Sequence, residues 1–283
     1  MKNSNSVFFE TWVRLKKNKV AFASLWILLF LIVVAVFAGL IAPYPYSMQN
    51  PSNILQKPSL KHIFGTDQYG RDIFSRVVYG ARISLSVGFI AVGVALLAGG
   101  FFGAIAGFYG GWLDNVIMRC MDILLSIPSV LLALAIVAAF GTSLPNLMLA
   151  TGVSTIPGYA RLVRATILTI KNQEYVEAAR AVGTNDFEII TRQILPNCMA
   201  PILVQATFGV ATAILTIAGL SFVGLGLQPP IPEWGSMLSD ARAYIRGYSY
   251  MLVSPAVAIA ITVFCLNSLG DGLRDALDPK LRD

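Results

Sequence analysis

The chain has little charge. Only 13% of its 283 residues are charged, 56% are hydrophobic, and the mean hydropathy is +0.69. Soluble domains carry about a quarter charged residues, so this composition predicts a membrane protein. The net charge of +6 does not indicate a nucleic-acid partner, because many basic residues flank apolar runs, as is typical of membrane proteins.

Cysteine and histidine are also scarce, which disfavours metal and redox sites. The three cysteines, Cys120, Cys198 and Cys265, lack metal-ligand spacing and lie in or beside apolar segments, so we interpret them as packing residues. The one histidine, His62, cannot form a histidine cluster or an H-E-x-x-H motif. An intramembrane enzyme is therefore disfavoured, and we expect no catalytic residue, cofactor-binding residue or metal ligand in this chain.

The sequence does contain several long apolar runs. Six of them approach the roughly 20 residues that a helix needs to cross about 30 Å of hydrocarbon. They cover residues 20–42, 83–109, 116–140, 144–163, 199–225 and 251–269. The first is too long for the apolar core of a secretory signal, and prolines and glycines interrupt the fourth. The predicted fold is an all-α membrane protein with six transmembrane helices.

The distribution of Lys and Arg predicts the orientation. With the basic N-terminus inside, the inner side carries about twice as many of these residues as the outer side, so both termini are expected in the cytoplasm. The expected segments are a cytoplasmic N-terminal segment (1–19), a first transmembrane helix (20–42), an extracytoplasmic loop (43–82), a five-helix core (83–269) and a cytoplasmic C-terminal tail (270–283).

Small residues recur every four positions in the second apolar run. They are Ala91, Ala95, Gly99, Gly103 and Gly107. Such a stripe lets neighbouring helix backbones approach closely. Three interpretations stay open: a helix that lines the bundle interior, a contact with another subunit, or tight packing within one chain.

Ionisable residues are sparse near the predicted spans. Arg119 and Asp122 are three positions apart on one helix face and are expected to pair. No carboxylate lies deep in any span, and no convincing internal repeat is present. Both observations argue against an ion-coupled secondary transporter.

The polar stretch 171–197 predicts two short helices that meet at a glycine. Strong helix formers end at Gly183, where a left-handed C-cap is expected. Asn185 and Glu188 have the spacing of a capping box, which starts a second helix that runs to about Leu195, before Pro196. Acidic and basic residues are mixed here, which favours a docking surface for another protein over a lipid-facing hairpin.

Glu177-Ala178-Ala179, followed by Gly183 and Leu195-Pro196, resembles the E-A-A loop of ABC importer permeases. Residues 62–88, 118–128, 220–238 and 269–283 look like the peptide and nickel branch of these permeases. Two positions depart from the usual pattern: Gln193 replaces an apolar residue, and Ile217 stands close to where many relatives carry a glutamate.

The resemblance implies a type I ABC importer permease bundle that works in a complex. The implied partners are a second, different permease, two ATPase subunits, an extracytoplasmic substrate-binding protein and membrane lipid, with no nucleic acid. ATP and Mg would be bound by the ATPase subunits, and this chain would hold no cofactor. The implied activity is import of short peptides across the cytoplasmic membrane of a bacterium or archaeon, with nickel or another small solute as the alternative.

The same resemblance implies that a coupling loop, 164–198, contacts the ATPase subunits. The residues assigned to this contact are Glu174, Glu177, Ala178, Ala179, Arg180, Gly183, Asp186 and Pro196.

The two predicted outer loops contain further candidate contact residues. In residues 226–251 we interpret Pro229, Pro230, Pro232 and Trp234 either as a contact with the docked binding protein or as a cap that closes the bundle.

In the other outer loop, Gly65 and Gly70 are expected to form turns, and Arg71, Asp72 and Arg76 to act as interfacial anchors or intersubunit contacts. The spacing of the two glycines is near that of a phosphate-binding loop. However, Arg71 and Asp72 stand where a lysine and a hydroxyl are required, so no nucleotide site is expected there.

Overall fold

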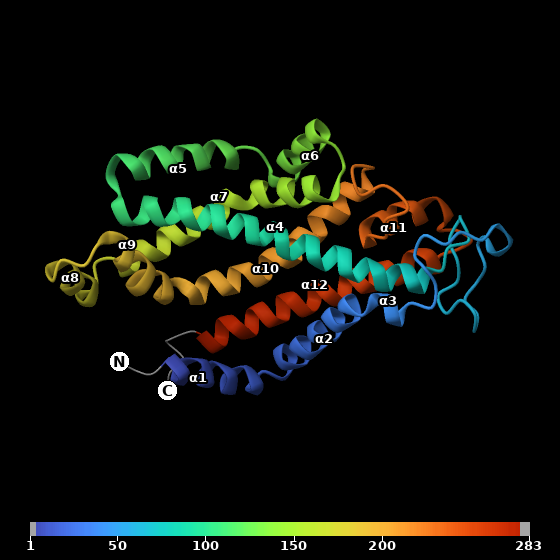
Figure 1. Ribbon diagram of the computed structural model, residues 1–283, viewed down its shortest axis with the longest axis horizontal. Coiled ribbons are helices and arrows are strands. Elements are labelled where there is room, and N and C mark those ends of the chain that lie inside the picture. Colours follow the sequence, from blue (N-terminus) through green and yellow to red (C-terminus); the bar gives the residue numbers. More distant parts are fainter. Residues whose placement is uncertain (1–3, 278–283) are drawn as a thin grey trace.

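A computed structural model describes residues 4–277 as an elongated bundle of helices (Figure 1). Its longer helices are α1 (Ser4–Lys17), α2 (Lys19–Val36), α4 (Ile73–Tyr109), α5 (Gly111–Leu125), α6 (Ser129–Phe140), α7 (Leu144–Ile170), α10 (Leu195–Phe222) and α12 (Tyr250–Leu277). Short helices are α3 (Ala38–Ile41), α8 (Glu174–Ala181), α9 (Asp186–Glu188) and α11 (Trp234–Ala241). Single turns are η1 (Pro51–Asn53), the π-helical η2 (Ile189–Ile194) and η3 (Arg242–Tyr244). The described residues contain no strand, which confirms the all-α class.

Within the described residues, fewer than six helices are both long and apolar enough to be identified as membrane spans. Among the described residues, four helical stretches are long and apolar enough to cross a membrane: α2, α4, the continuous stretch Asp186–Phe222, and α12. A fifth span results if α5 and α6 are counted together. Although α7 has 27 residues, it carries two prolines and several polar residues and is not among these stretches. The count of six is therefore not confirmed as such.

The third predicted span is wrong as a single helix. α5 and α6 meet at an angle of 83° around residues 126–128. Pro128 has no N–H for a helical hydrogen bond, and its ring disfavours a helical conformation of Ile127. The break therefore falls where proline chemistry requires it, inside a run that composition alone presents as continuous.

The second predicted span begins earlier than expected. The Asp72 carboxylate caps α4 by accepting a hydrogen bond from the Ser75 N–H at 2.8 Å. The resulting helix has 37 residues. At 1.5 Å per residue it is about 55 Å long, so it extends well beyond the about 30 Å of a hydrocarbon layer.

α4 packs along α7 through the predicted stripe of small residues. All five of its members are buried. A side-chain carbon at Gly99 would lie 2.7 Å from the Ile156 carbonyl oxygen, and one at Gly107 would lie 3.0 Å from Cβ of Ile167. A side-chain carbon at Gly103 would lie closer still to its neighbour, the Ala160 carbonyl oxygen. The stripe is thus a packing contact between two helices of the same chain.

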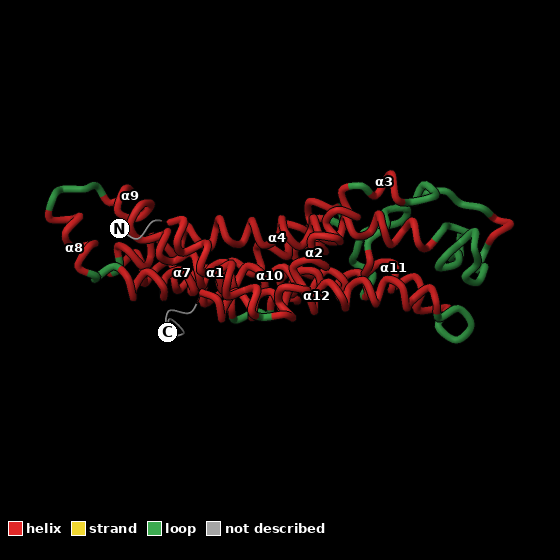
Figure 2. Tube along the Cα trace, turned by 90° about the horizontal axis from the view of Figure 1, so that it is seen from below, coloured by secondary structure: helices red, strands yellow, loops and turns green. Residues whose placement is uncertain are grey.

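The two ends of the molecule differ. α8 and α9 lie at one end, and at the opposite end the chain forms an outer cap, which we define as residues 43–72 and 223–249 (Figures 1 and 2). α1 and the start of α2 pack against the last turns of α12, where a side-chain carbon at Gly272 would meet Leu15 of α1 and Ala21 of α2. Of the predicted tail 270–283, residues up to 277 continue α12 and the rest lie outside the described residues.

Candidate functional site

α8 is the first part of the candidate site, and its ending follows the sequence rules. Gly183 has φ +80°, so the predicted left-handed turn is present. Its N–H donates to the Arg180 carbonyl at 3.0 Å, and the Thr184 N–H donates to the Ala179 carbonyl at 3.1 Å. These bonds satisfy carbonyl groups that the end of a helix would otherwise leave unpaired.

α8 is fastened to the ends of the long helices. Val176 is fully buried in an apolar cluster that includes Phe108 on α4, Ile167 on α7 and Cys198 on α10. The Arg180 guanidinium lies 5.0 Å from the centre of the Phe108 ring, a cation–π contact. α8 is therefore packed against the ends of three long helices.

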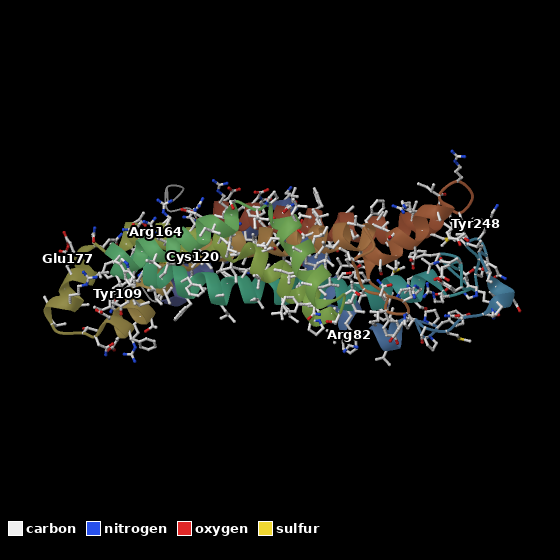
Figure 3. The ribbon with its side chains drawn as sticks, turned by 90° about the horizontal axis from the view of Figure 1, so that it is seen from above. Arg82, Tyr109, Cys120, Arg164, Glu177 and Tyr248 are labelled. Atoms are coloured by element: carbon white, nitrogen blue, oxygen red, sulfur yellow. The ribbon has the colours of Figure 1, made fainter. Side chains whose placement is uncertain are left out.

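The other face of α8 is open. Seven of the eight predicted coupling residues are exposed, namely Glu174, Glu177, Ala178, Arg180, Gly183, Asp186 and, at the start of α10, Pro196; Ala179 is half-buried. Figure 3 shows Glu177 at the extreme end of the molecule. Large apolar side chains flank the Gly183 turn, since Val182 is 81% exposed and Phe187 is 77% exposed. Exposed apolar residues within a polar rim are typical of a surface that contacts another protein.

The second helix of the loop starts as predicted but does not end as predicted. The Asn185 side chain accepts a hydrogen bond from the Glu188 N–H at 2.8 Å. The helix then continues without a stop into α10, through the wider turn of η2, where the Leu195 N–H bonds to the carbonyl of Ile190. Proline lacks an N–H and clashes with the carbonyl four residues before it in a regular helix. The wider π turn just before Pro196 lets the helix pass through it.

In the outer cap, the predicted contact residues divide into exposed and buried ones. Pro229 and Pro230 are exposed, whereas Pro232 and Trp234 are buried. The Trp234 indole N–H donates to the Val77 carbonyl at 3.0 Å, and its ring lies against Gly80. For Trp234 the interpretation as part of a cap that closes the bundle fits, because its buried side chain holds α11 against α4.

Glu233, next to Trp234, is a buried carboxylate that sequence reasoning missed. It is 2% exposed and accepts hydrogen bonds from the Gly235 N–H at 2.6 Å, the Ser236 N–H at 2.7 Å and the Ser221 hydroxyl at 2.8 Å. The carboxylate oxygens of Glu233 thus accept hydrogen bonds from the N-terminus of α11 and from Ser221 of α10. A Glu directly before a short polar helix was the available signal.

The charged residues of the first outer loop are also buried. Arg71 Nε lies 2.6 Å and Arg76 Nε 3.6 Å from Asp67 Oδ2, and both arginines are at most 2% exposed. Arg71 also lies 3.8 Å from Asp240 of α11. Burial raises the pKa of Asp240, and the charges of Arg71 and Arg76 oppose that shift. The expectation of interfacial anchors is therefore wrong.

The other predicted residues of this loop also make contacts or turns within the outer cap. Asp72, predicted as an anchor, caps α4 and pairs with His62 at 2.8 Å, and both side chains are buried. Gly65 and Gly70 have φ values of +77° and +69°, so the predicted turns are present. Arg76 of α4 donates to the Tyr46 carbonyl at 3.3 Å and to the Pro230 carbonyl at 3.1 Å, which joins the two segments of the outer cap.

Comparison with known protein families shows to which family this chain belongs. Residues 99–283 match the family described as binding-protein-dependent transport system inner membrane component. The chain belongs to this family. Residues 6–58 match the N-terminal TM domain of oligopeptide transport permease C. The N-terminal helices are therefore a recognised extension of the permease core.

Two curated relatives match the permease over nearly its whole length. The dipeptide transport system permease protein DppC of Alkalihalophilus pseudofirmus is 50% identical over 273 residues, which cover 96% of this chain and 90% of the relative. The glutathione transport system permease protein GsiD of Escherichia coli is 46% identical over 274 residues, with the same coverage of 96% and 90%.

Solved structures show the same fold at low sequence identity. A chain of the inward-facing methionine ABC transporter MetNI superposes with a TM-score of 0.59 and 21% identity, over 72% of this permease and 96% of that chain. A chain of an amino acid ABC transporter with histidines superposes with a TM-score of 0.54 and 16% sequence identity. The match covers 71% of this permease and 94% of that chain. The permease therefore has the type I ABC importer fold.

Two Arg–Asp pairs join α5 to α7 in the permease. Arg164 contacts both carboxylate oxygens of Asp114, at 2.5 and 2.6 Å. Arg161 contacts one oxygen of Asp122, at 2.8 Å. The predicted pairing of Asp122 with Arg119 is therefore wrong, because the neighbouring helix offers a closer partner.

The permease offers no obvious metal centre in the described residues. Within residues 4–277, no group of three or more His, Cys, Asp or Glu side chains is placed to hold a metal ion.

Proposed function

We propose that this permease is one of the two membrane-spanning subunits of an ATP-driven importer of short peptides. The observation that carries the proposal is the geometry of α8: its outer face is open for another protein, and its inner face is buried against three long helices. That arrangement suits a lever between an ATPase subunit and the membrane-spanning helices.

The proposed orientation places α8 in the cytoplasm and the outer cap outside. The excess of Lys and Arg on the α8 side supports this orientation. Segment 1–19 and the tail from 270 then lie inside with α8. On the outer side Pro229 and Pro230 remain available to a docked substrate-binding protein.

The proposed mechanism involves no covalent chemistry in this chain. Two ATPase subunits bind ATP and Mg and close on each other, and their closure pushes α8 through Glu177, Arg180 and the Gly183 turn. Because α8 is fastened to α4, α7 and α10, this permease and a second, different permease rock as rigid bodies. ATP drives the change because it binds one state of the complex more tightly than the other.

The proposed substrate is a short peptide. The support is that relatives 50% and 46% identical are named for dipeptide and glutathione transport, and glutathione is itself a short peptide. Nickel or another small solute is the second candidate, because the sequence motifs are shared with the nickel branch.

Uptake by the reconstituted complex tests this function. We expect vesicles that contain both permeases and both ATPase subunits to accumulate a radiolabelled dipeptide only when ATP and the binding protein are present. Excess unlabelled dipeptide is expected to abolish the signal, and excess nickel to leave it unchanged. Accumulation of labelled nickel without accumulation of peptide would instead establish the second candidate.

A further inference from the structure

The exposed faces of the long helices are of two chemical kinds. On α2 the exposed side chains are large and apolar, for example Phe30 at 65% and Val33 at 50% exposed. On α12 the exposed Val257 and Phe264 are of the same kind. Such faces suit lipid contact, because lipid solvates apolar side chains and leaves polar groups unsatisfied.

One face shared by α7 and α10 is different. Two adjoining cavities lie along it, with volumes of about 540 Å³ and about 570 Å³, and both are lined by Leu162 and Gln205. Together they form what we call the polar groove. Its lining includes the hydrogen-bonding residues Ser154, Thr155, Arg161, Asn197, Gln205 and Thr212, which lie among apolar residues such as Leu162 and Val204.

The polar groove runs along much of the bundle. From Asn197 to Thr212 the α10 helix rises about 22 Å, or roughly two-thirds of a hydrocarbon layer. Asn197, Gln205 and Thr212 are all exposed in this chain. Exposed polar side chains in the middle of a spanning helix are unfavourable in lipid, and inside membrane proteins such side chains usually face the bundle interior or a water-filled cavity.

Gln205 is the group in the groove best prepared to bind a solute. The hydroxyls of Thr155 and Thr212 donate to backbone carbonyls of their own helices, at 3.1 and 3.0 Å. Within residues 4–277 the Gln205 side-chain amide makes no hydrogen bond, and the side chain is exposed in the groove. An amide offers two donors and an acceptor, which is the complement of a peptide backbone.

One of the two Arg–Asp pairs also faces this groove. The Arg161 and Asp122 side chains are 58% and 50% exposed and share a single hydrogen bond. The matching Arg164 and Asp114 side chains are 31% and 14% exposed and are held by two bonds. The exposed pair Arg161–Asp122 therefore places charge at the edge of the groove. The pair Arg164–Asp114 is more buried and holds α5 and α7 together through two bonds.

We propose that the polar groove is this permease's wall of the translocation pathway, and that Gln205 hydrogen-bonds the backbone of the passing peptide. The opposite wall belongs to the second permease, so the groove stays hydrated and is not filled by protein or lipid. This inference rests on the proposed function for the identity of the solute, but the hydration of the groove is independent of it.

Thiol accessibility in the reconstituted complex tests the groove. The background is Cys120→Ser, because Cys120 is exposed whereas Cys198 and Cys265 are buried. We expect Gln205→Cys and Thr212→Cys to react with a charged methanethiosulfonate reagent supplied on both sides of the vesicles, and peptide with ATP to slow the reaction severalfold. Phe30→Cys and Val33→Cys on α2 are the lipid-facing controls and should not react. Groove positions as unreactive as these controls would overturn the inference.

Transport kinetics test the role of Gln205. Gln205→Leu is expected to raise the KM for peptide uptake about tenfold, the loss that follows from one hydrogen bond, while Gln205→Asn restores part of it. An unchanged KM in Gln205→Leu would overturn this role. If the wild-type complex takes up no peptide although Gln205→Cys still reacts, the proposed substrate is wrong and the groove remains a pathway for another solute.

Discussion

Replacing Gly183 with valine is expected to lower peptide uptake and substrate-stimulated ATP hydrolysis at least tenfold. Gly183 has φ +80°, and this left-handed conformation costs a residue with a Cβ about 1–2 kcal/mol, with β-branched residues the least tolerant. No atom lies within 4 Å of the position a Cβ would take, so the effect does not come from a clash inside the chain. The strain is relieved by unwinding the turn, which displaces Val182 and Phe187 from the surface offered to the ATPase subunit.

Gly183→Asn is the matched control for this experiment. Asparagine adopts the left-handed conformation far more readily than valine, so its uptake should stay close to that of the wild type. Both activities are measured in the same vesicles, together with the amount of assembled complex. Normal coupling in Gly183→Val would show that the turn does not transmit force.

Asp67→Ala is expected to destabilise the permease by about 3–5 kcal/mol, the usual result of removing one partner of a buried ion pair. Asp67 is the carboxylate that Arg71 and Arg76 share, and both arginines are buried. Without the Asp67 carboxylate, the hydrogen-bond partners of Arg76 are carbonyl oxygens alone, and the carboxylate nearest to Arg71 is the more distant one of Asp240. The outer cap should then loosen from α4 and α11.

Glu188→Ala supplies the comparison for Asp67→Ala. Glu188 also pairs with an arginine, Arg192, but the two side chains are 38% and 74% exposed. An exposed pair of this kind contributes about 0.3–0.5 kcal/mol, so thermal unfolding of the purified protein should hardly change. Equal unfolding temperatures for the two variants would contradict the account of the cap as a rigid, ion-paired structure.

The parts of the fold that could be predicted are those governed by neighbouring residues. The Gly183 turn and the Asn185 cap follow from the conformational preferences of single residues and their immediate sequence. The stripe on α4 follows from the period of the helix, although the sequence could not name α7 as its partner. The break between α5 and α6 was readable at Pro128, but the apolar run around it concealed the signal.

What could not be predicted depends on contacts between distant parts of the chain. Asp122 pairs with Arg161 on another helix, and the Trp234 indole bonds to a carbonyl of α4. Arg71 and Arg76 look like surface charges in the sequence, because even with Asp67 nearby nothing shows that Asp240 and the Pro230 carbonyl, far along the chain, will contact them. The polar groove likewise exists only where α7 and α10 lie side by side.

The central claim, that α8 is the contact through which ATPase subunits drive this permease, is tested most directly by cross-linking. A photoreactive benzoylphenylalanine replaces Phe187, which is 77% exposed beside the Gly183 turn, and in a second variant it replaces the exposed Pro229 of the outer cap. On illumination of the assembled complex, the account predicts a covalent product with the ATPase subunit from position 187 and none from position 229. Failure to capture the ATPase from position 187, or its capture from position 229, would contradict the account.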